Sequence, residues 1–93
     1  MDDLLGHLVV SLAGRDKGCI CAVVGYADDE GYVLIADGRT RKVEHPKKKK
    51  LMHIKPLEPE LPVAALPESR LTNRFIREAV GAAAGLADRK SVV

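Results

Sequence analysis

The fold is decided by two short apolar runs joined by a polar loop, in the stretch His7-Leu-Val-Val-Ser-Leu-Ala-Gly-Arg-Asp-Lys-Gly-Cys-Ile-Cys-Ala-Val-Val24. Residues 7–12 and 19–24 are rich in β-branched and small apolar side chains, which favour an extended chain. Gly14 and Gly18 bound the loop between them and can adopt the positive φ that other residues avoid. This stretch therefore predicts two strands of an antiparallel sheet connected by a tight loop.

Three further extended runs complete the predicted sheet. Residues 32–36 have the clearest strand pattern, and Asp37 and Gly38 follow them. An Asp-Gly pair between two extended runs is typical of a type I′ hairpin turn, so residues 39–43 are predicted to form an exposed edge strand. A closing strand is predicted over residues 51–54. Five short strands with tight connections predict a small antiparallel barrel.

The second half of the chain is predicted to contain a connector and a helix. Residues 56–68 contain four prolines and three acids, which predicts a semi-rigid extended connector after a barrel over residues 1–55. Residues 69–87 carry helical periodicity, with Gly85 as the expected stop. Residues 88–93 are then a short tail. The predicted fold class is mainly β, with one C-terminal α-helix.

Composition narrows the possible functions. The 93 residues suffice for one domain, and an aromatic fraction of 3% disfavours a platform of stacked bases. No apolar run approaches the length of a membrane span, and the acidic start at Met1 is unlike a signal peptide. Two cysteines are too few for a disulfide scaffold. We therefore expect a cytoplasmic protein with reduced thiols.

Charge is sorted along the chain. Residues 1–38 contain seven acids and two bases, whereas residues 39–55 contain eight bases and one acid. The most concentrated charge is four consecutive lysines, Lys47 to Lys50, which are predicted to lie in a loop. Lysine ammonium groups are compact point charges that suit phosphates, although a lysine run can also be a solvated loop that maintains solubility. This distribution predicts an anionic partner for the middle segment.

Two blocks of the sequence resemble a KOW motif. The first is Gly6 to Val24, and the second is Asp37-Gly-Arg-Thr-Arg-Lys-Val-Glu-His-Pro-Lys-Lys-Lys-Lys-Leu-Met-His53. The pair is similar to KOW-type large-subunit ribosomal proteins of archaea and eukaryotes and to short bacterial KOW proteins. The resemblance implies an SH3-like barrel that binds RNA. Many KOW motifs have a basic residue and a second glycine where this chain has Cys19 and Cys21, which shifts the expected RNA contact toward residues 39–55.

The expected site residues follow from the resemblance and the charge pattern together. The resemblance places Arg15 and Lys17 on the loop that commonly approaches RNA in the family. The predicted RNA contacts are Arg15, Lys17, Arg39, Arg41, Lys42, Lys47, Lys48, Lys49 and Lys50. The predicted structural positions of the motif are Gly14, Gly18, Asp37 and Gly38.

The sequence favours no catalytic or metal site. Cys19 and Cys21 face the same side of a predicted strand, and His45 and His53 could in principle complete a zinc set. The spacing is Cys-x-Cys without a second cysteine pair, so we expect free thiols and no metal. No residue pattern indicates a catalytic centre, a cofactor or a small-molecule substrate.

The predicted function is non-catalytic binding of structured ribosomal RNA through its phosphates, with ribosomes or ribosome-assembly intermediates as partners. One alternative is a protein-interaction module that docks on the transcription or translation machinery, although such modules usually have an aromatic groove and this chain has few rings. Arg70, Arg74 and Arg77 form a basic helix face that either stays in water or extends the RNA surface. A membrane-surface role for this helix is disfavoured because it has few bulky apolar anchors.

Overall fold

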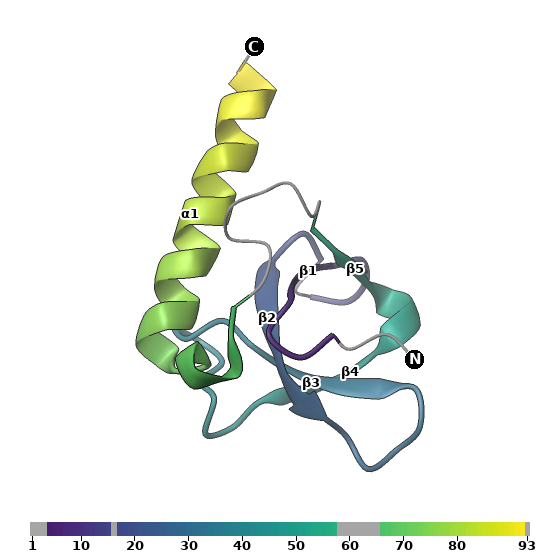
Figure 1. Ribbon diagram of the computed structural model, residues 1–93. Helices are drawn as coiled ribbons and strands as arrows, with labels where there is room; N and C mark the ends of the chain where they lie inside the picture. Colours follow the sequence, from purple (N-terminus) through teal and green to yellow (C-terminus); the bar gives the residue numbers. More distant parts are fainter. Residues whose placement is uncertain (1–3, 16, 58–65, 93) are drawn as a thin grey trace.

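The computed structural model describes residues 4–15, 17–57 and 66–92, with the backbone alone for residue 68 and residues 85–92. Within these residues, five strands, two short 3₁₀ helices and one α-helix form a mainly β structure (Figure 1). In chain order the elements are β1 (Leu8–Ser11), β2 (Ile20–Tyr26), β3 (Tyr32–Ala36), β4 (Lys47–Lys50), η1 (Leu51–His53), β5 (Ile54–Pro56), η2 (Glu68–Arg70) and α1 (Asn73–Val92).

The five strands form one antiparallel sheet in the order β4-β3-β2-β1-β5. Strands β1, β2 and β3 are each paired with the strand that follows in the chain, and β5 returns to pair with β1. A register shift between Val23 and Gly25 interrupts the β2–β3 ladder. Such a bulge increases the local twist of a sheet, which helps it to curl.

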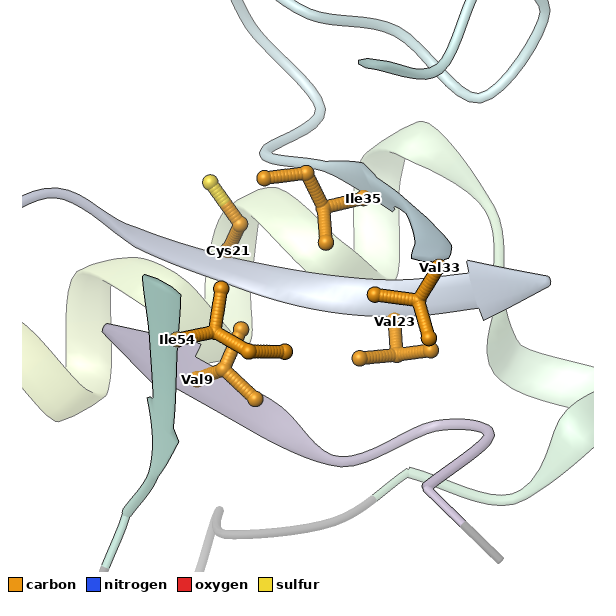
Figure 2. Packing of buried hydrophobic residues seen from close by; sticks show 6 residues of the cluster. All are labelled: Val9, Cys21, Val23, Val33, Ile35 and Ile54. Carbon is orange, nitrogen blue, oxygen red and sulfur yellow. The ribbon is translucent and has the colours of Figure 1, made fainter. Parts of the chain in front are cut away.

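One face of the sheet holds the first of two apolar clusters. Its members come from β1, β2, β3 and β5 and point toward one another: Val9, Cys21, Val23, Val33, Ile35 and Ile54 (Figure 2). Ile54 belongs to the edge strand β5, yet it packs in the same cluster as two side chains of β3. The sheet is therefore strongly curled around this inner face. Burying each Val or Ile stabilises the fold by about 1.5–3 kcal/mol.

Helix α1 covers the outer face and makes the second cluster. Leu8 and Ala22 of the sheet pack against Ile76, Ala79 and Ala83 of the helix. Two alanines in the contact allow the helix backbone to approach β2 closely, because their side chains are small. Figure 1 shows α1 beside β2, with the C-terminal part of the helix reaching beyond the sheet.

The start of α1 is tied to the loop between β3 and β4. The Asn73 Oδ1 atom accepts a hydrogen bond from the Val43 N–H at 2.9 Å, and its Nδ2 group donates to the Glu44 carboxylate at 2.9 Å. The bond from Asn73 lowers the pKa of the Glu44 carboxyl group, because it stabilises the charged form. Arg77 Nη1 donates to the Gly38 carbonyl at 3.5 Å. The helix therefore holds this loop in place.

The sequence-based prediction of β4 was wrong. Residues 39–43 form part of the loop, and the lysines Lys47–Lys50 form the strand. A type I′ turn needs positive φ at both central residues, but Gly38 has φ +80° while Asp37 has no positive φ. The Asp37 Oδ1 atom instead accepts hydrogen bonds from the N–H groups of Arg39 and Arg41, both at 2.9 Å, which turns the chain away from β3.

Three further element boundaries differ from the prediction. Residues 51–53, predicted as strand, form η1, and β5 follows at Ile54–Pro56. Helix α1 begins at Asn73 and continues through Gly85 and the predicted tail to Val92, because Gly85 keeps a helical backbone instead of terminating the helix. Of the predicted Pro-rich connector, residues 58–65 lie outside the described residues. On either side of them, the Leu57 N–H donates to Leu8 and the Leu66 N–H donates to Gly6.

Candidate nucleic-acid interface

The four lysines of β4 do not form a single patch. Residues directly opposite each other on antiparallel strands share a face, and Lys47 and Lys49 pair with Ile35 and Val33 of the inner cluster. Lys48 and Lys50 pair with Leu34 and Tyr32 on the other face. The alternation of strand side chains therefore divides the lysine run into two pairs with different surroundings.

Lys49 is a structural residue. Only 8% of it is exposed, and its Nζ group donates to the Ala13 carbonyl at 2.9 Å. This bond connects β4 to the loop between β1 and β2. A buried ammonium group needs such partners because burial without them is costly. Lys49 is therefore unlike the exposed phosphate contact that the sequence predicts.

Replacing Lys49 by Ala should destabilise the fold by about 1–3 kcal/mol, because the part-buried Ala13 carbonyl loses a charged donor. The midpoint of thermal unfolding should fall by roughly 5–15 °C for a domain of this size. The control is Lys48→Ala, which removes the same side chain from an exposed position with a surface ion pair and should change stability by less than about 1 kcal/mol. Equal midpoints for the two variants would contradict the structural assignment.

The outward lysines lie around Tyr32. Lys48 Nζ is 4.9 Å from the centre of the Tyr32 ring and forms an ion pair with Asp29, and Lys50 Nζ is 6.0 Å from the same ring. The hydrogen bond to Asp29 raises the pKa of the Lys48 ammonium group, because it stabilises the charged form. The Asp29 carboxylate thus offsets the charge of Lys48, one of these two lysines.

A pocket of about 260 Å³ brings three of the predicted RNA contacts together. Arg15 comes from the β1–β2 loop, Arg41 from the β3–β4 loop and Lys47 from β4. Cys21 and Ile35 of the inner cluster contribute apolar lining. The remaining lining residues are Cys19, Asp37 and Thr40. Three basic residues from three separate segments of the chain therefore line one hollow.

Asp37 adds a negative charge near the pocket and also fixes the backbone of the loop beside it. Asp37 is among the lining residues, and its carboxylate accepts hydrogen bonds from the N–H groups of Arg39 and Arg41. Since these bonds fix the start of the loop, the Arg41 side chain is presented from an ordered backbone. The lining carries three basic side chains and one carboxylate, so positive charge dominates.

The other predicted contacts lie outside this pocket. Lys17, Arg39 and Lys42 are exposed on the two loops that frame it. Of the two reasons expected for Gly18, a positive φ or a clash of any side chain, the structure shows the positive φ, at +88°, and no clash, since nothing lies within 4 Å of an added Cβ atom. Gly14 also has a positive φ, at +86°. The positive φ angles of the two glycines turn the chain in the β1–β2 loop, which carries Arg15 to the pocket.

The two cysteines contribute to the same pocket. Cys19 is exposed, Cys21 is buried, and both are free. The two-residue spacing predicted that Cys19 and Cys21 face the same side of a strand. Nothing in the sequence predicted that Thr40 or the cysteines lie beside the basic residues. In the part of the chain that the structure describes, no three His, Cys, Asp or Glu side chains gather as metal ligands.

The three arginines predicted to form a basic helix face have separate contacts, and Arg70 lies in η2 before the start of α1. The Arg70 guanidinium lies 5.1 Å from the centre of the Phe75 ring, and Arg74 Nε is 3.5 Å from Glu78 one turn along the helix. Arg77 contacts the Gly38 carbonyl. The predicted basic helix face is therefore partly engaged within the protein. Within the described residues, no helix combines the length and apolar character that crossing a membrane requires.

Neither a comparison with models of known protein families nor a search of curated proteins finds a match for this chain.

Proposed function

We propose that this chain is a non-catalytic RNA-binding protein of the KOW type, whose curled sheet and C-terminal helix form an SH3-like barrel with an added helix. The observation that carries the proposal is the convergence of Arg15, Arg41 and Lys47 on one pocket. A phosphodiester is the ligand that this lining suits, because two guanidinium groups and an ammonium group can donate hydrogen bonds to its oxygens.

The surroundings of the pocket favour recognition of the RNA backbone. None of the chain's aromatic rings is among the pocket's lining residues, so stacking of bases is not its means of binding. Lys17, Arg39 and Lys42 on the framing loops are exposed and can contact adjacent phosphates. Structured RNA presents phosphates in a fixed arrangement, which a preformed pocket can recognise by shape. Ribosomal RNA, in ribosomes or their assembly intermediates, is the proposed partner.

The test is a titration of the full chain with ribosomal RNA fragments over a range of salt concentrations. If about four to six phosphates are contacted, the logarithm of the affinity should fall with the logarithm of salt with a slope of roughly −3 to −5. An unrelated single-stranded RNA of equal length serves as the control and should bind more weakly. A slope near zero, or equal affinity for both RNAs, would contradict binding of structured RNA through phosphates.

A further inference from the structure

A second hollow lies at the other end of the sheet from the basic pocket. Its volume is about 510 Å³, and its lining includes Tyr26, Tyr32, Leu51 and Pro56. Tyr26 is the last residue of β2, whereas Cys21 of the basic pocket lies near the start of that strand. Five residues of extended chain separate the two by roughly 15 Å. Both tyrosines of the chain are therefore gathered at a site that the proposed RNA pocket does not use.

The hollow continues into an apolar patch on η1. An adjoining hollow of about 320 Å³ shares Tyr32 and Leu51 with the first and adds Lys50 and Met52. Met52 is 74% exposed, Tyr26 is 45% exposed and Leu51 is 41% exposed. Single exposed apolar residues are common, but a group of large ones around a hollow is typical of an interaction site. We call the two hollows together the tyrosine groove.

The tyrosine groove is built on ordered backbone. The Tyr26 hydroxyl accepts a hydrogen bond from the Leu4 N–H at 2.9 Å, and the Leu51 N–H donates to the Gly31 carbonyl at 2.9 Å. The second bond joins η1 to the turn between β2 and β3. Because these contacts hold the ring of Tyr26 and the start of η1 in place, little ordering is needed when a ligand binds.

Charge at the rim distinguishes this groove from the basic pocket. Asp29 and Glu30 line it at the turn between β2 and β3, and Asp28 is exposed beside them. Lys48, which is paired with Asp29, and Lys50, which lines the second hollow, offset two of these three negative charges, so the rim keeps a net negative charge. Carboxylates at this rim repel phosphates and attract cations. Lys48 already lies against the Tyr32 ring, which limits stacking of a base on that face. These features favour a basic peptide over a nucleic acid.

We propose that the tyrosine groove binds a short segment of a partner protein in which an apolar side chain is adjacent to Lys or Arg. The apolar side chain fits against Tyr26, Leu51 and Pro56, and the basic side chain pairs with Glu30 at the rim. Met52 covers the exposed end of the apolar contact. The protein would then hold RNA at one end of its sheet and a protein segment at the other.

The experiment selects peptides from a displayed library of random sequences on the full chain, and then measures the affinity of the selected peptide by fluorescence polarisation. We expect the selected peptides to share an apolar residue beside Lys or Arg. Glu30→Lys and Met52→Ser should each weaken binding by roughly tenfold, equivalent to about 1.4 kcal/mol. Leu12→Ser is the matched control, because Leu12 is 45% exposed but does not line the groove.

Three results would overturn the proposal. One is the absence of any enriched sequence, and another is an affinity that Glu30→Lys leaves unchanged in folded protein. The third comes from a titration with an eight-residue oligouridylate, followed through the ring signals of Tyr26 and Tyr32 in NMR spectra. Movement of both rings with the oligonucleotide, and not with the selected peptide, would make the groove a base-binding site. The RNA titration of the basic pocket is independent, so either proposal can fail alone.

Discussion

Replacing Arg15, Arg41 and Lys47 together by Ala should weaken binding to structured RNA by at least about a hundredfold. Each charge-assisted contact is worth about 1.5–3 kcal/mol, and three contacts to one phosphate group are less than additive, so a total near 3 kcal/mol is expected. The salt dependence should flatten by about one unit of slope, because the pocket variant loses one neutralised phosphate. Filter binding at several salt concentrations measures both quantities.

A second triple variant separates the pocket from charge in general. Replacing Lys17, Arg39 and Lys42 by Ala removes the same number of positive charges from exposed positions on the framing loops. These residues make peripheral contacts in the proposed complex, so the affinity should fall by about tenfold or less. The slope should flatten by up to about two to three units, because each side chain contacts a separate phosphate. Both variants should stay folded, since none of the six side chains belongs to either apolar cluster.

The comparison of the two triple variants decides the proposal. A larger loss for the pocket variant supports a preformed phosphate site. Equal losses would show that binding depends on net charge, and the pocket would then have no special role. Normal binding by the pocket variant would exclude the convergence of its three basic residues as the means of binding RNA.

Local patterns in the sequence predicted the first three strands well. Alternating β-branched residues, and glycines at positions 14 and 18, are signals that depend on neighbouring residues only. Both glycines have the positive φ that the loop requires. The helix was also predicted, because the spacing of Ile76, Ala79 and Ala83 follows the period of a helix and these residues are buried against the sheet.

The fourth strand could not be predicted because its stability comes from its partner strand. Four lysines have a low preference for strand, and the exposed pattern of residues 39–43 resembles an edge strand more closely. In the structure, Lys47–Lys50 pair with four apolar or aromatic residues of β3, and the long lysine stems cover apolar surface there. Lysines on an edge strand also oppose pairing with another molecule.

The candidate site was predicted in its residue types but not in its grouping. The sequence predicted that all nine basic residues contact RNA. In the structure, three of them line the pocket, Lys49 is buried, and Lys48 is paired with Asp29. Arg15 meets Arg41 and Lys47 because the sheet curls, which brings two loops distant in sequence to the same hollow. The tyrosine groove was missed for the same reason, since Tyr26 and Leu51 are far apart in the chain.

The second large expected effect is a loss of stability when Gly38, which contacts α1, is replaced by a residue with a side chain. Gly38 has φ +80°, and a Cβ atom built on it would lie 2.4 Å from the Asn73 carbonyl oxygen and 3.0 Å from the Arg77 nitrogen. Both neighbours are backbone atoms, so they cannot rotate away as a side chain would. Gly38→Ala therefore requires the first turn of α1 to move away from the β3–β4 loop.

Gly38→Ala should destabilise the protein by about 2–4 kcal/mol, from positive φ and from overpacking together. The midpoint of thermal unfolding, followed by circular dichroism, should fall by roughly 10–25 °C. Gly18→Ala is the matched control, because Gly18 has φ +88° with nothing within 4 Å of the added Cβ atom. Gly18→Ala should lower the free energy of unfolding only through the unfavourable positive φ, by about 1–2 kcal/mol.

The difference between the two glycine variants isolates the contact between helix and loop. If the midpoints fall equally, α1 does not press on Gly38, and the arrangement of helix and loop is wrong. If Gly38→Ala is the more damaging change, the helix anchors the loop that also carries Arg41. Displacing α1 should then weaken RNA binding at temperatures where the variant is still folded, because the Asn73 bonds to Val43 and Glu44 that hold this loop are lost with the contact.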